Sequence, residues 1–362
     1  RFEEWKQVED AWVLQPENGQ APKAVIHFVG GAFVGASPHI TYQFFLELLS
    51  ERGFLIVATP YASTFDHIRA ADEVQFAFDR CYRVLRRTNA DLDGLPVFGV
   101  GHSMGSLLHL LIGARYAFQP KERLGNVLIS FNNLRARDAV PILLPELSPL
   151  IQLGLAPLLA PLQNLPFPIL AATNELRKAA PPIVQQLLPI VDQIRPILDD
   201  VADGRQEFTP SPDESMGIVK RNYRVSQNLV IRFTDDGIDE SKRLAPVLAT
   251  TAAGCDNVDL TYKSLPGNHA RPVQQPVPEE VLRALEVPPS MASTVEQVAQ
   301  AVSESTASTP LEPVGEAAMS FAQAGNEMVG LDQAKEAIVE DVTKLVDEVS
   351  DWITYSMRVV DW

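Results

Sequence analysis

Gly101-His102-Ser103-Met104-Gly105 is the stretch that decides the fold of this chain. The apolar, β-branched run 95–101 precedes it and the mostly apolar run 106–116 follows it, which predicts a strand, a G-x-S-x-G turn and a buried helix. A serine on such a turn has strained backbone dihedrals, and the flanking glycines let the strand and the helix pass close together. The helix also directs its positive end toward an oxyanion that develops at the serine. Ser103 is therefore the predicted nucleophile.

The composition limits the classes of function that the chain can have. With 362 residues, 46% of them apolar, it is long enough for one large α/β domain with additions, or for two smaller domains. A net charge of −16 argues against a nucleic-acid partner. Cys81 and Cys255 are too few for a disulfide framework, and without a C-x-x-C or H-E-x-x-H motif we expect no metal and no cofactor.

Two further observations concern membranes and processing. No uninterrupted apolar run of about 20 residues occurs, so we expect no membrane span. The chain begins at Arg1 rather than at methionine, which fits the removal of a leader that the sequence does not identify.

Strand-like and helix-like segments alternate through the first part of the chain. Buried strands are expected at 23–29, 54–60, 95–101, 126–133, 228–234 and 258–262. Helices are expected at 39–52, 68–87, 106–116 and 241–248, and a short edge strand within 1–22. This alternation predicts an α/β fold with a mostly parallel, doubly wound sheet. We place its core in residues 1–138 and 217–275.

A different composition separates these two parts of the core. Prolines recur through the apolar residues 139–200, which predicts several short, broken helices, and 203–216 is expected to be a polar, Pro-rich connection. Residues 139–216 would then form a cap over the site. The apolar composition of this cap favours a hydrophobic substrate or peripheral contact with a membrane surface. The alternative is a helical subdomain that buries its own apolar residues.

The C-terminal part differs from both. Residues 276–330, rich in Ala, Ser, Thr, Glu and Gln, are expected to be a partly helical linker. From Leu331 to Ile353 the apolar residues follow helical spacing opposite an acidic face, which predicts an amphipathic helix over 331–362. Its acidic face argues against binding anionic lipid. We expect this helix to dock back on the domain or on a protein partner.

The expected oxyanion hole follows the strand at 23–29. Small residues in Gly30-Gly31-Ala32 allow backbone N–H groups to turn inward, so we expect one donor from Gly31 or Ala32 and the other from Met104. The stretch resembles the H-G-G-G loop of esterases and lipases, with Val29 where those have histidine. A plain strand-to-helix turn is the alternative.

A serine hydroxyl needs a base to take its proton, and an acid to orient that base. In α/β-hydrolases the chain order is serine, acid, histidine, and among the six histidines only His269 follows the acid-bearing strand. Asp236 is the preferred acid, with Asp235 as the runner-up and Asp239 assigned to capping the next helix. Asp66 and His67 either line the pocket or form a solvated loop pair.

Long stretches resemble one known family, the domain-of-unknown-function family 1350. They include Val29–Ala36, Phe54–Tyr61, Phe65–His67, Asp72–Phe76, Pro96–His109, Phe131–Asn133, Phe208–Glu214, Asp235–Glu240 and Leu265–His269. The resemblance covers residues 23–275 and implies an α/β-hydrolase fold in a plastid (chloroplast) or cyanobacterial setting. It implies no established substrate, and the tail after about residue 276 lies outside it.

These observations favour a serine hydrolase that acts on a carboxylic ester of a hydrophobic, lipid or phytyl-type substrate. A thioesterase or acyltransferase would use the same residues, since only the acyl donor or the acceptor differs. A catalytically weak scaffold, which binds a protein partner through the cap or the C-terminal helix, is the alternative from another class. We expect the protein to be soluble or peripherally attached to a membrane.

Overall fold

The computed structural model describes residues 5–16, 20–116, 123–136, 138, 207–251, 258–275 and 331–359. The chain divides into two compact units, of which one holds residues 1–136, 189–273 and 341–362 and the other holds 137–188 and 274–340. Residues 139–206 of the expected cap and the expected linker at 276–330 lie outside the described residues.

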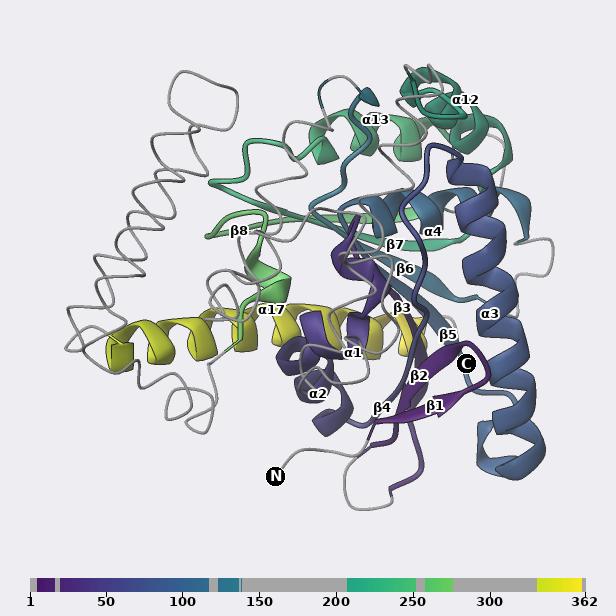
Figure 1. Cartoon of the computed structure of the whole chain (residues 1–362), viewed down its shortest axis with the longest axis vertical. Coiled ribbons are helices and arrows are strands. Elements are labelled where there is room, and N and C mark those ends of the chain that lie inside the picture. Colours follow the sequence, from purple (N-terminus) through teal and green to yellow (C-terminus); the bar gives the residue numbers. More distant parts are fainter. Residues whose placement is uncertain are drawn as a thin grey trace, which may run out of the picture. The chain divides into compact units, whose positions relative to one another are not determined.

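An eight-stranded sheet forms the centre of the first unit among the described residues, in the order β1-β2-β4-β3-β5-β6-β7-β8 (Figure 1). Its strands are β1 (Lys6–Val8), β2 (Ala11–Leu14), β3 (Ala24–Val29), β4 (Phe54–Ala58), β5 (Val97–His102), β6 (Gly125–Ile129), β7 (Gln227–Phe233) and β8 (Asp259–Leu265). The six strands β4, β3, β5, β6, β7 and β8 are all parallel to their neighbours. β1 and β2 form a hairpin at one edge, and β2 pairs antiparallel with β4. The prediction of a mostly parallel α/β sheet is confirmed.

Helices cover both faces of the sheet. They are α1 (Pro38–Thr41), α2 (Gln43–Glu51), α3 (His67–Thr88), α4 (Met104–Arg115), α12 (Pro212–Asn222), α13 (Ser241–Thr251) and α17 (Leu331–Val359). One apolar cluster joins side chains of α3, α4, α12 and α13 to β3, β6 and β7. On the opposite face Phe28 of β3 packs on Tyr42 and Phe45, and Phe98 of β5 packs on Trp352 of α17. The sheet is therefore doubly wound, as predicted.

The four innermost strands are buried along their whole length. β3, β4, β5 and β6 have no exposed residue, because helices lie on both faces. Parallel strands in this position lack the polar alternation of a half-exposed sheet, and the near-continuous apolar runs in the sequence reflect that. β8 is an edge strand with mostly exposed side chains, and it extends to Leu265, beyond the expected end at 262.

Two helices differ from the sequence expectation. The single helix expected at 39–52 is broken at Tyr42, which separates α1 from α2 and whose ring turns inward. The region 203–216, expected to be a connection, contains the start of α12. Ser211 and Glu214 form a capping box there, and Pro212 occupies the first turn. Ser211, Pro212 and Glu214 are a helix-start signal, so the segment begins a helix rather than a loop.

The C-terminal helix packs on the unit with its apolar stripe. Fully or nearly fully buried side chains on it are Val342, Leu345, Val346, Val349, Trp352 and Ile353. Burying one such side chain contributes about 1.5–3 kcal/mol. Arg52, after α2, binds Asp347 at 2.5 Å, and Lys263 of β8 binds Glu348 at 3.2 Å. Of the two expectations for this helix, docking back on the domain is the one observed for residues 341–359.

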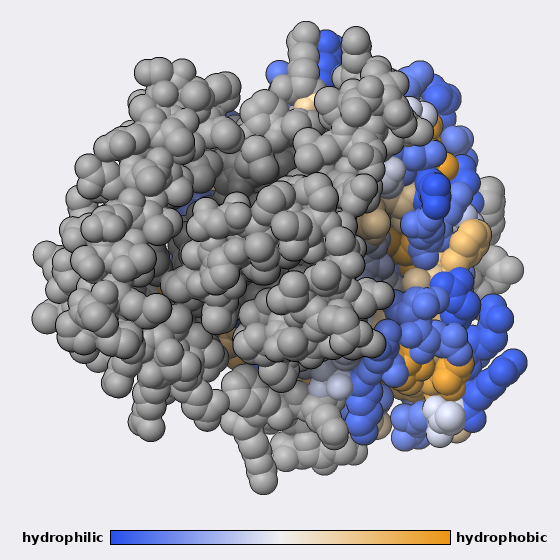
Figure 2. All heavy atoms as spheres, in the orientation of Figure 1, coloured by the Kyte–Doolittle hydropathy of each residue, from blue (hydrophilic) through white to orange (hydrophobic). Residues whose placement is uncertain are grey.

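The outer surface of α3 is largely hydrophilic in the visible, described part of Figure 2. Ion pairs such as Arg69–Glu73 and Arg86–Asp93 lie on it, and Phe76 is a half-exposed apolar side chain among them. Within the described ranges, no helix combines the length and the apolar character needed to cross a bilayer.

Candidate active site

Ser103 occupies the sharp turn between β5 and α4. Its backbone angles, φ 56° and ψ −120°, lie in a region that non-glycine residues rarely adopt. The turn is held because the Ser103 N–H donates to the carbonyl of Ile129 on β6 at 2.9 Å. The side chain is 4% exposed, at the amino end of α4. This is the strand–turn–helix geometry that the motif predicts.

The flanking glycines are required by close backbone contacts. A Cβ at Gly101 would lie 2.6 Å from the carbonyl oxygen of Gly105, and a Cβ at Gly105 would collide with the carbonyl of Val29. The first turn of α4 therefore runs directly against the end of β3. Any larger residue at either position would push the helix away from the strand and open the turn that holds Ser103.

His269 and Asp236 lie together at the carboxyl end of the sheet. His269 Nδ1 is 2.8 Å from Asp236 Oδ2, the Asp236 side chain is fully buried, and the His269 side chain is 14% exposed. Burial by itself raises the pKa of Asp236. The hydrogen bond and charge of His269, with smaller contributions from the Ser130 hydroxyl and the Ile238 N–H, outweigh it and bring the pKa below its ordinary value. The carboxyl group is thus held as the anion.

The neighbouring aspartates have other roles in the structure. Asp235 is exposed, and its backbone N–H donates to the carbonyl of Gly267 at 2.8 Å. Asp239 accepts hydrogen bonds from the N–H and the hydroxyl of Ser241, the first residue of α13. Of the three carboxylates, Asp236 is therefore the one that the loop turns toward His269.

A hydrogen bond connects His269 to the residue beside the serine. The backbone carbonyl of His269 lies 2.9 Å from His102 Nε2, and the two imidazole rings are 4.8 Å apart between centroids. His269 arrives from the loop after β8, whereas His102 ends β5. The tertiary fold thus brings together two residues that are 167 positions apart in the chain.

The backbone amides expected to bind an oxyanion differ in orientation. The Gly31 N–H donates to the hydroxyl of Tyr42 at 2.7 Å, whereas the Ala32 N–H has no protein acceptor among the described residues. Phe33, with φ 63°, turns its own N–H to the Ser63 hydroxyl. The Met104 N–H belongs to the first turn of α4, where amides have no acceptor within the helix. Ala32 and Met104 are thus the better placed pair of donors.

Three residues of the site were not selected from the sequence. Tyr42 and His102 contact each other, at 2.8 Å between the hydroxyl and Nδ1, and Ser130, at φ 49° after β6, lies beside Asp236. For His102 a signal existed, because strand alternation places Phe98, Val100 and His102 on one face of β5. For Tyr42 and Ser130 the sequence offers none, since their contacts cross between elements.

Asp66 and His67, considered for the pocket, serve the start of α3. Asp66 Oδ1 accepts from the Arg69 N–H at 2.9 Å and so caps the helix. His67 is 2% exposed and stacks on Phe208 with 4.5 Å between ring centroids, and burial lowers its pKa to about 4. His67 is therefore not part of a solvated pair.

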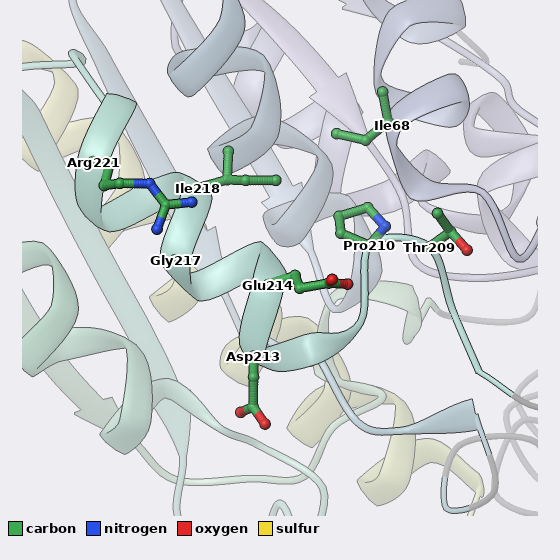
Figure 3. Close-up of a pocket in the computed structure, with 8 residues that line it drawn as sticks. All are labelled: Ile68, Thr209, Pro210, Asp213, Glu214, Gly217, Ile218 and Arg221. Atoms are coloured by element: carbon green, nitrogen blue, oxygen red, sulfur yellow. The ribbon is translucent and has the colours of Figure 1, made fainter.

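A surface hollow lies between α3 and α12, with a volume of about 650 Å³ (Figure 3). Ile68 and Ile218 line it from the two helices, with Pro210 between them. Glu214, also in its lining, is engaged by the Ser211 cap. None of the candidate catalytic side chains lines this hollow. Among the described residues, no cluster of three His, Cys, Asp or Glu side chains is arranged to bind a metal ion.

The strand order, the antiparallel first hairpin and a strained serine between β5 and α4 together define an α/β-hydrolase fold. The chain belongs to the family described as "Protein of unknown function (DUF1350)", whose sequence profile matches residues 4–289. The match extends beyond the resemblance noted in the sequence, at both ends.

Solved structures with the same fold include several hydrolases. Esterase B from Lactobacillus rhamnosis HN001 is 14% identical, with a TM-score of 0.45 over 83% of this chain and 89% of that one. The CarC serine hydrolase involved in carbazole degradation is 16% identical, with a TM-score of 0.44 over 78% and 96%. The thioesterase domain from the curacin biosynthetic pathway is 15% identical, with a TM-score of 0.40 over 75% and 94%. No curated protein matches the sequence. No activity is transferred from these likenesses.

Proposed function

We propose that this protein is a serine hydrolase that cleaves a carboxylic ester of a hydrophobic substrate. The observation that carries the proposal is the strained Ser103 at the β5–α4 turn, together with His269, which is paired with the buried Asp236 and whose carbonyl bonds to His102, the residue before the serine. Strain of this kind persists only where the surrounding structure maintains it, and it gathers at functional sites. A nucleophile, a base and an orienting acid complete the set of groups that acyl transfer requires.

We assign each step of the proposed reaction to one group of this site. Ser103 Oγ attacks the ester carbonyl carbon while Nε2 of His269 takes the hydroxyl proton. Nδ1 of His269 keeps its proton toward Asp236, whose charge stabilises the imidazolium that forms. The tetrahedral intermediate then collapses, and the imidazolium gives its proton to the leaving alcohol. Water repeats the sequence on the acyl-enzyme, with His269 again as the base.

The negative charge of the intermediate falls on the carbonyl oxygen. We assign its stabilisation to the N–H groups of Met104 and Ala32, because the N–H of Gly31 is bonded to Tyr42. The amino end of α4 adds a positive potential at the same place. Loss of one such donor typically lowers kcat by about 10²–10³-fold.

The substrate class follows from the sequence of the cap. Residues 139–206 are rich in Leu, Ile, Val and Pro, and an apolar covering favours a long acyl chain or a phytyl-type alcohol over a small polar ester. The plastid or cyanobacterial setting implied by the resemblance fits acyl lipids and phytyl esters. Contact of the cap with a membrane surface would give access to such substrates.

The C-terminal helix is a poor candidate for the docking surface of a scaffold protein. The apolar stripe that a partner would need, including Leu345 and Ile353, is already buried within the unit. Deleting 331–362 would therefore uncover core side chains, and loss of partner binding in that deletion would not separate the two functions. Point variants in the site separate them directly.

Labelling with a fluorophosphonate probe tests the proposal, because only an activated serine reacts at an appreciable rate. We expect wild type to be labelled and Ser103→Ala and His269→Ala to lose labelling by about 10³-fold or more. Ser211→Ala is the matched control, since it costs about 1 kcal/mol of helix capping at a distance from the site. It is expected to be labelled like wild type.

A substrate panel then identifies the acyl donor and acceptor. Long-chain acyl esters, phytyl esters and thioesters are compared by kcat/KM, with and without an added alcohol as acyl acceptor. Preferential hydrolysis of long-chain oxygen esters supports the proposal. Faster thioester cleavage, or transfer to the alcohol in place of hydrolysis, would identify a thioesterase or an acyltransferase. A folded wild type that is not labelled, with or without detergent, would refute the catalytic function.

A further inference from the structure

His102, the residue before the serine, is placed by strand alternation. Phe98, Val100 and His102 point to the face of β5 that carries α1 and α2, whereas Gly99 and Gly101 point to the face of α4. The His102 side chain therefore points away from α4. Its ring is 3% exposed and lies between Tyr42 and His269.

The hydrogen bonds fix the tautomer of His102. Nε2 is 2.9 Å from the backbone carbonyl of His269, which can only accept, so Nε2 carries the proton. Burial, with a smaller contribution from the charge of His269, lowers the pKa of His102 to about 3, so the ring is neutral near pH 7. In a neutral imidazole with Nε2 protonated, Nδ1 is an acceptor.

The direction of the remaining bonds follows. Since Nδ1 of His102 accepts, the Tyr42 hydroxyl, 2.8 Å away, donates to it. The Tyr42 oxygen in turn accepts from the Gly31 N–H at 2.7 Å. The result is one chain of hydrogen bonds, from the Gly31 N–H through Tyr42 and His102 to the His269 carbonyl, in which each donor meets an acceptor.

We propose that His102 and Tyr42 are positioning residues, which tie the oxyanion loop to the backbone of the catalytic histidine across the serine turn. The inference rests on the proposed serine-hydrolase function, and it assigns neither residue a contact with substrate. A Cβ built on Gly31 would lie 3.2 Å from Ser103 Cβ, 3.4 Å from His102 Nδ1 and 3.4 Å from the Tyr42 hydroxyl. The loop, the serine and the hydrogen-bond chain therefore meet within van der Waals contact.

The chain of hydrogen bonds matters because His269 lies on a loop. Asp236 orients the His269 imidazole through its hydrogen bond to Nδ1. The position of the His269 backbone relative to the sheet is fixed by a different bond, the one from His102 Nε2 to the His269 carbonyl. Misplacing a reacting group by about 1 Å costs about 10²-fold in rate. The same chain of hydrogen bonds fixes the Gly31 N–H, and so it also helps to orient the N–H of Ala32, the next residue.

The rate of fluorophosphonate labelling measures this positioning. We expect His102→Leu and Tyr42→Phe each to slow labelling by about 10–100-fold. His102→Gln, which keeps a donor for the His269 carbonyl and an acceptor for Tyr42, is expected to regain most of the rate. The double variant Tyr42→Phe/His102→Leu is expected to be no slower than the slower single variant, because both changes break one chain.

The matched control is Tyr223→Phe. Tyr223 is another fully buried tyrosine, whose hydroxyl bonds to Asn126 and Asn228 in the core. Its loss is expected to lower stability without changing the labelling rate of folded protein. The pH at which the labelling rate is half maximal is expected to stay the same in His102→Leu, because the Asp236–His269 pair remains. Labelling of His102→Leu at the wild-type rate, or a His102→Gln as slow as His102→Leu, would overturn the proposal.

A measurement that needs no activity separates the two proposals. In protein with ¹⁵N-labelled histidine rings, His102 is expected to be neutral with Nε2 protonated throughout the range from about pH 5 to 9. Tyr42→Phe is expected to shift the His102 Nδ1 resonance, since it loses its donor. Protonation on Nδ1, or a charged ring at pH 7, would overturn the positioning chain even if Ser103 is labelled. An unlabelled wild type with the expected tautomer would refute the hydrolase and its positioning residues while leaving the geometry intact.

Discussion

Two pairs of histidines in this protein have opposite surroundings. His27 and His109 lie in the core on the α3–α4 face of the sheet, and their Nδ1 atoms each accept a hydrogen bond from the guanidinium of Arg123, at 2.8 Å. His102 and His269 lie at the carboxyl end of the strands, where Nδ1 of His269 faces the carboxylate of Asp236. The first pair is therefore held by a cation, whereas in the second pair His269 faces an anion and His102 bonds to the Tyr42 hydroxyl and the His269 carbonyl.

Burial and the cation keep the first pair neutral. Burial, with the charge of Arg123, holds the pKa values of His27 and His109 well below the ordinary 6.5, so both rings remain neutral acceptors. Arg123 is buried as well, which lowers its pKa to about 10. The charge of Asp79 partly offsets this lowering of the Arg123 pKa. Gln75 lies between the two residues and forms a hydrogen bond to each. This cluster can stabilise the fold but cannot take a proton from a nucleophile.

The partner of Nδ1 therefore decides whether a histidine can act as a general base. A carboxylate at Nδ1 stabilises the imidazolium, which a general base must become during the reaction. A guanidinium at Nδ1 penalises the same charge. His109 lies six residues after Ser103 and is nearer to it in sequence than His269, yet it faces the cation.

The largest effect is expected from removing the anion. Asp236→Asn removes the charge that stabilises the His269 imidazolium, and we expect the labelling rate and kcat to fall by about 10³–10⁴-fold. Asp235→Asn is the matched control, because Asp235 is exposed, and it is expected to stay within about threefold of wild type. Equal losses in the two variants, or the larger loss in Asp235→Asn, would contradict the pairing of Asp236 with His269.

The next largest effect is expected from a change in the packing around the Arg123 guanidinium, which should lower the free energy of unfolding. A Cβ on Gly99 would lie 2.5 Å from Arg123 Nη1 and 2.8 Å from His109 Nδ1, and would collide with the Asn126 amide. We expect Gly99→Ala to lower the free energy of unfolding by about 3 kcal/mol. Gly237→Ala, where a Cβ meets open space, is expected to change it by about 0.5 kcal/mol or less. Urea unfolding measures both, and an unchanged Gly99→Ala would contradict the packing.

Removing the cation itself tests what the core pair contributes. Arg123→Met leaves the Nδ1 acceptors of His27 and His109 without a donor, so we expect a loss of about 2–3 kcal/mol in unfolding free energy. The labelling rate of the folded variant is expected to be that of wild type. Arg80→Met, which breaks an exposed ion pair with Asp10, should cost about 1 kcal/mol or less. A slower labelling rate in Arg123→Met would show that the two regions are coupled.

The smallest expected effect is the contribution of each buried histidine to the pH dependence of the free energy of unfolding. His27, His102 and His109 have folded pKa values below 6.5, so below that pH the unfolded chain binds more protons than the folded one. Their contribution is present above about pH 6.5 and is lost as the pH falls, at about 1.4 kcal/mol per pH unit for each histidine. Asp236, whose pKa is also lowered, acts in the same direction at lower pH.

Urea unfolding between about pH 7 and 5 measures this slope. The variant His109→Gln lacks one titrating ring and is expected to be less stable at pH 7 but to show a shallower slope. A free energy of unfolding that stays constant over this range would mean that the histidines titrate equally in the folded and the unfolded chain. That result would contradict the burial of the core pair.

Much of the fold could be predicted because local pattern and tertiary environment agree. The runs at 23–29 and 54–60 are apolar on both faces, as strands covered by helices on both sides must be. Glycines at 101 and 105 identified the Ser103 turn, since no larger residue fits there. The prolines of 203–216 suggest a connection, but Pro212 is compatible with the first turn of a helix, which the capping box of Ser211 and Glu214 starts.

Periodicity, glycine spacing and chain order predict the strands, most of the helices and their order, and they predict a chemical set of Ser103, His269 and a carboxylate. The three-dimensional contacts were needed to show which carboxylate faces His269 and which amide of Gly31 and Ala32 is bonded to Tyr42. The folded arrangement settled both. It also decided that the apolar stripe of α17 packs on the sheet. These outcomes depend on the direction of side chains and peptide groups in loops, and contacts between residues far apart in the chain fix those directions.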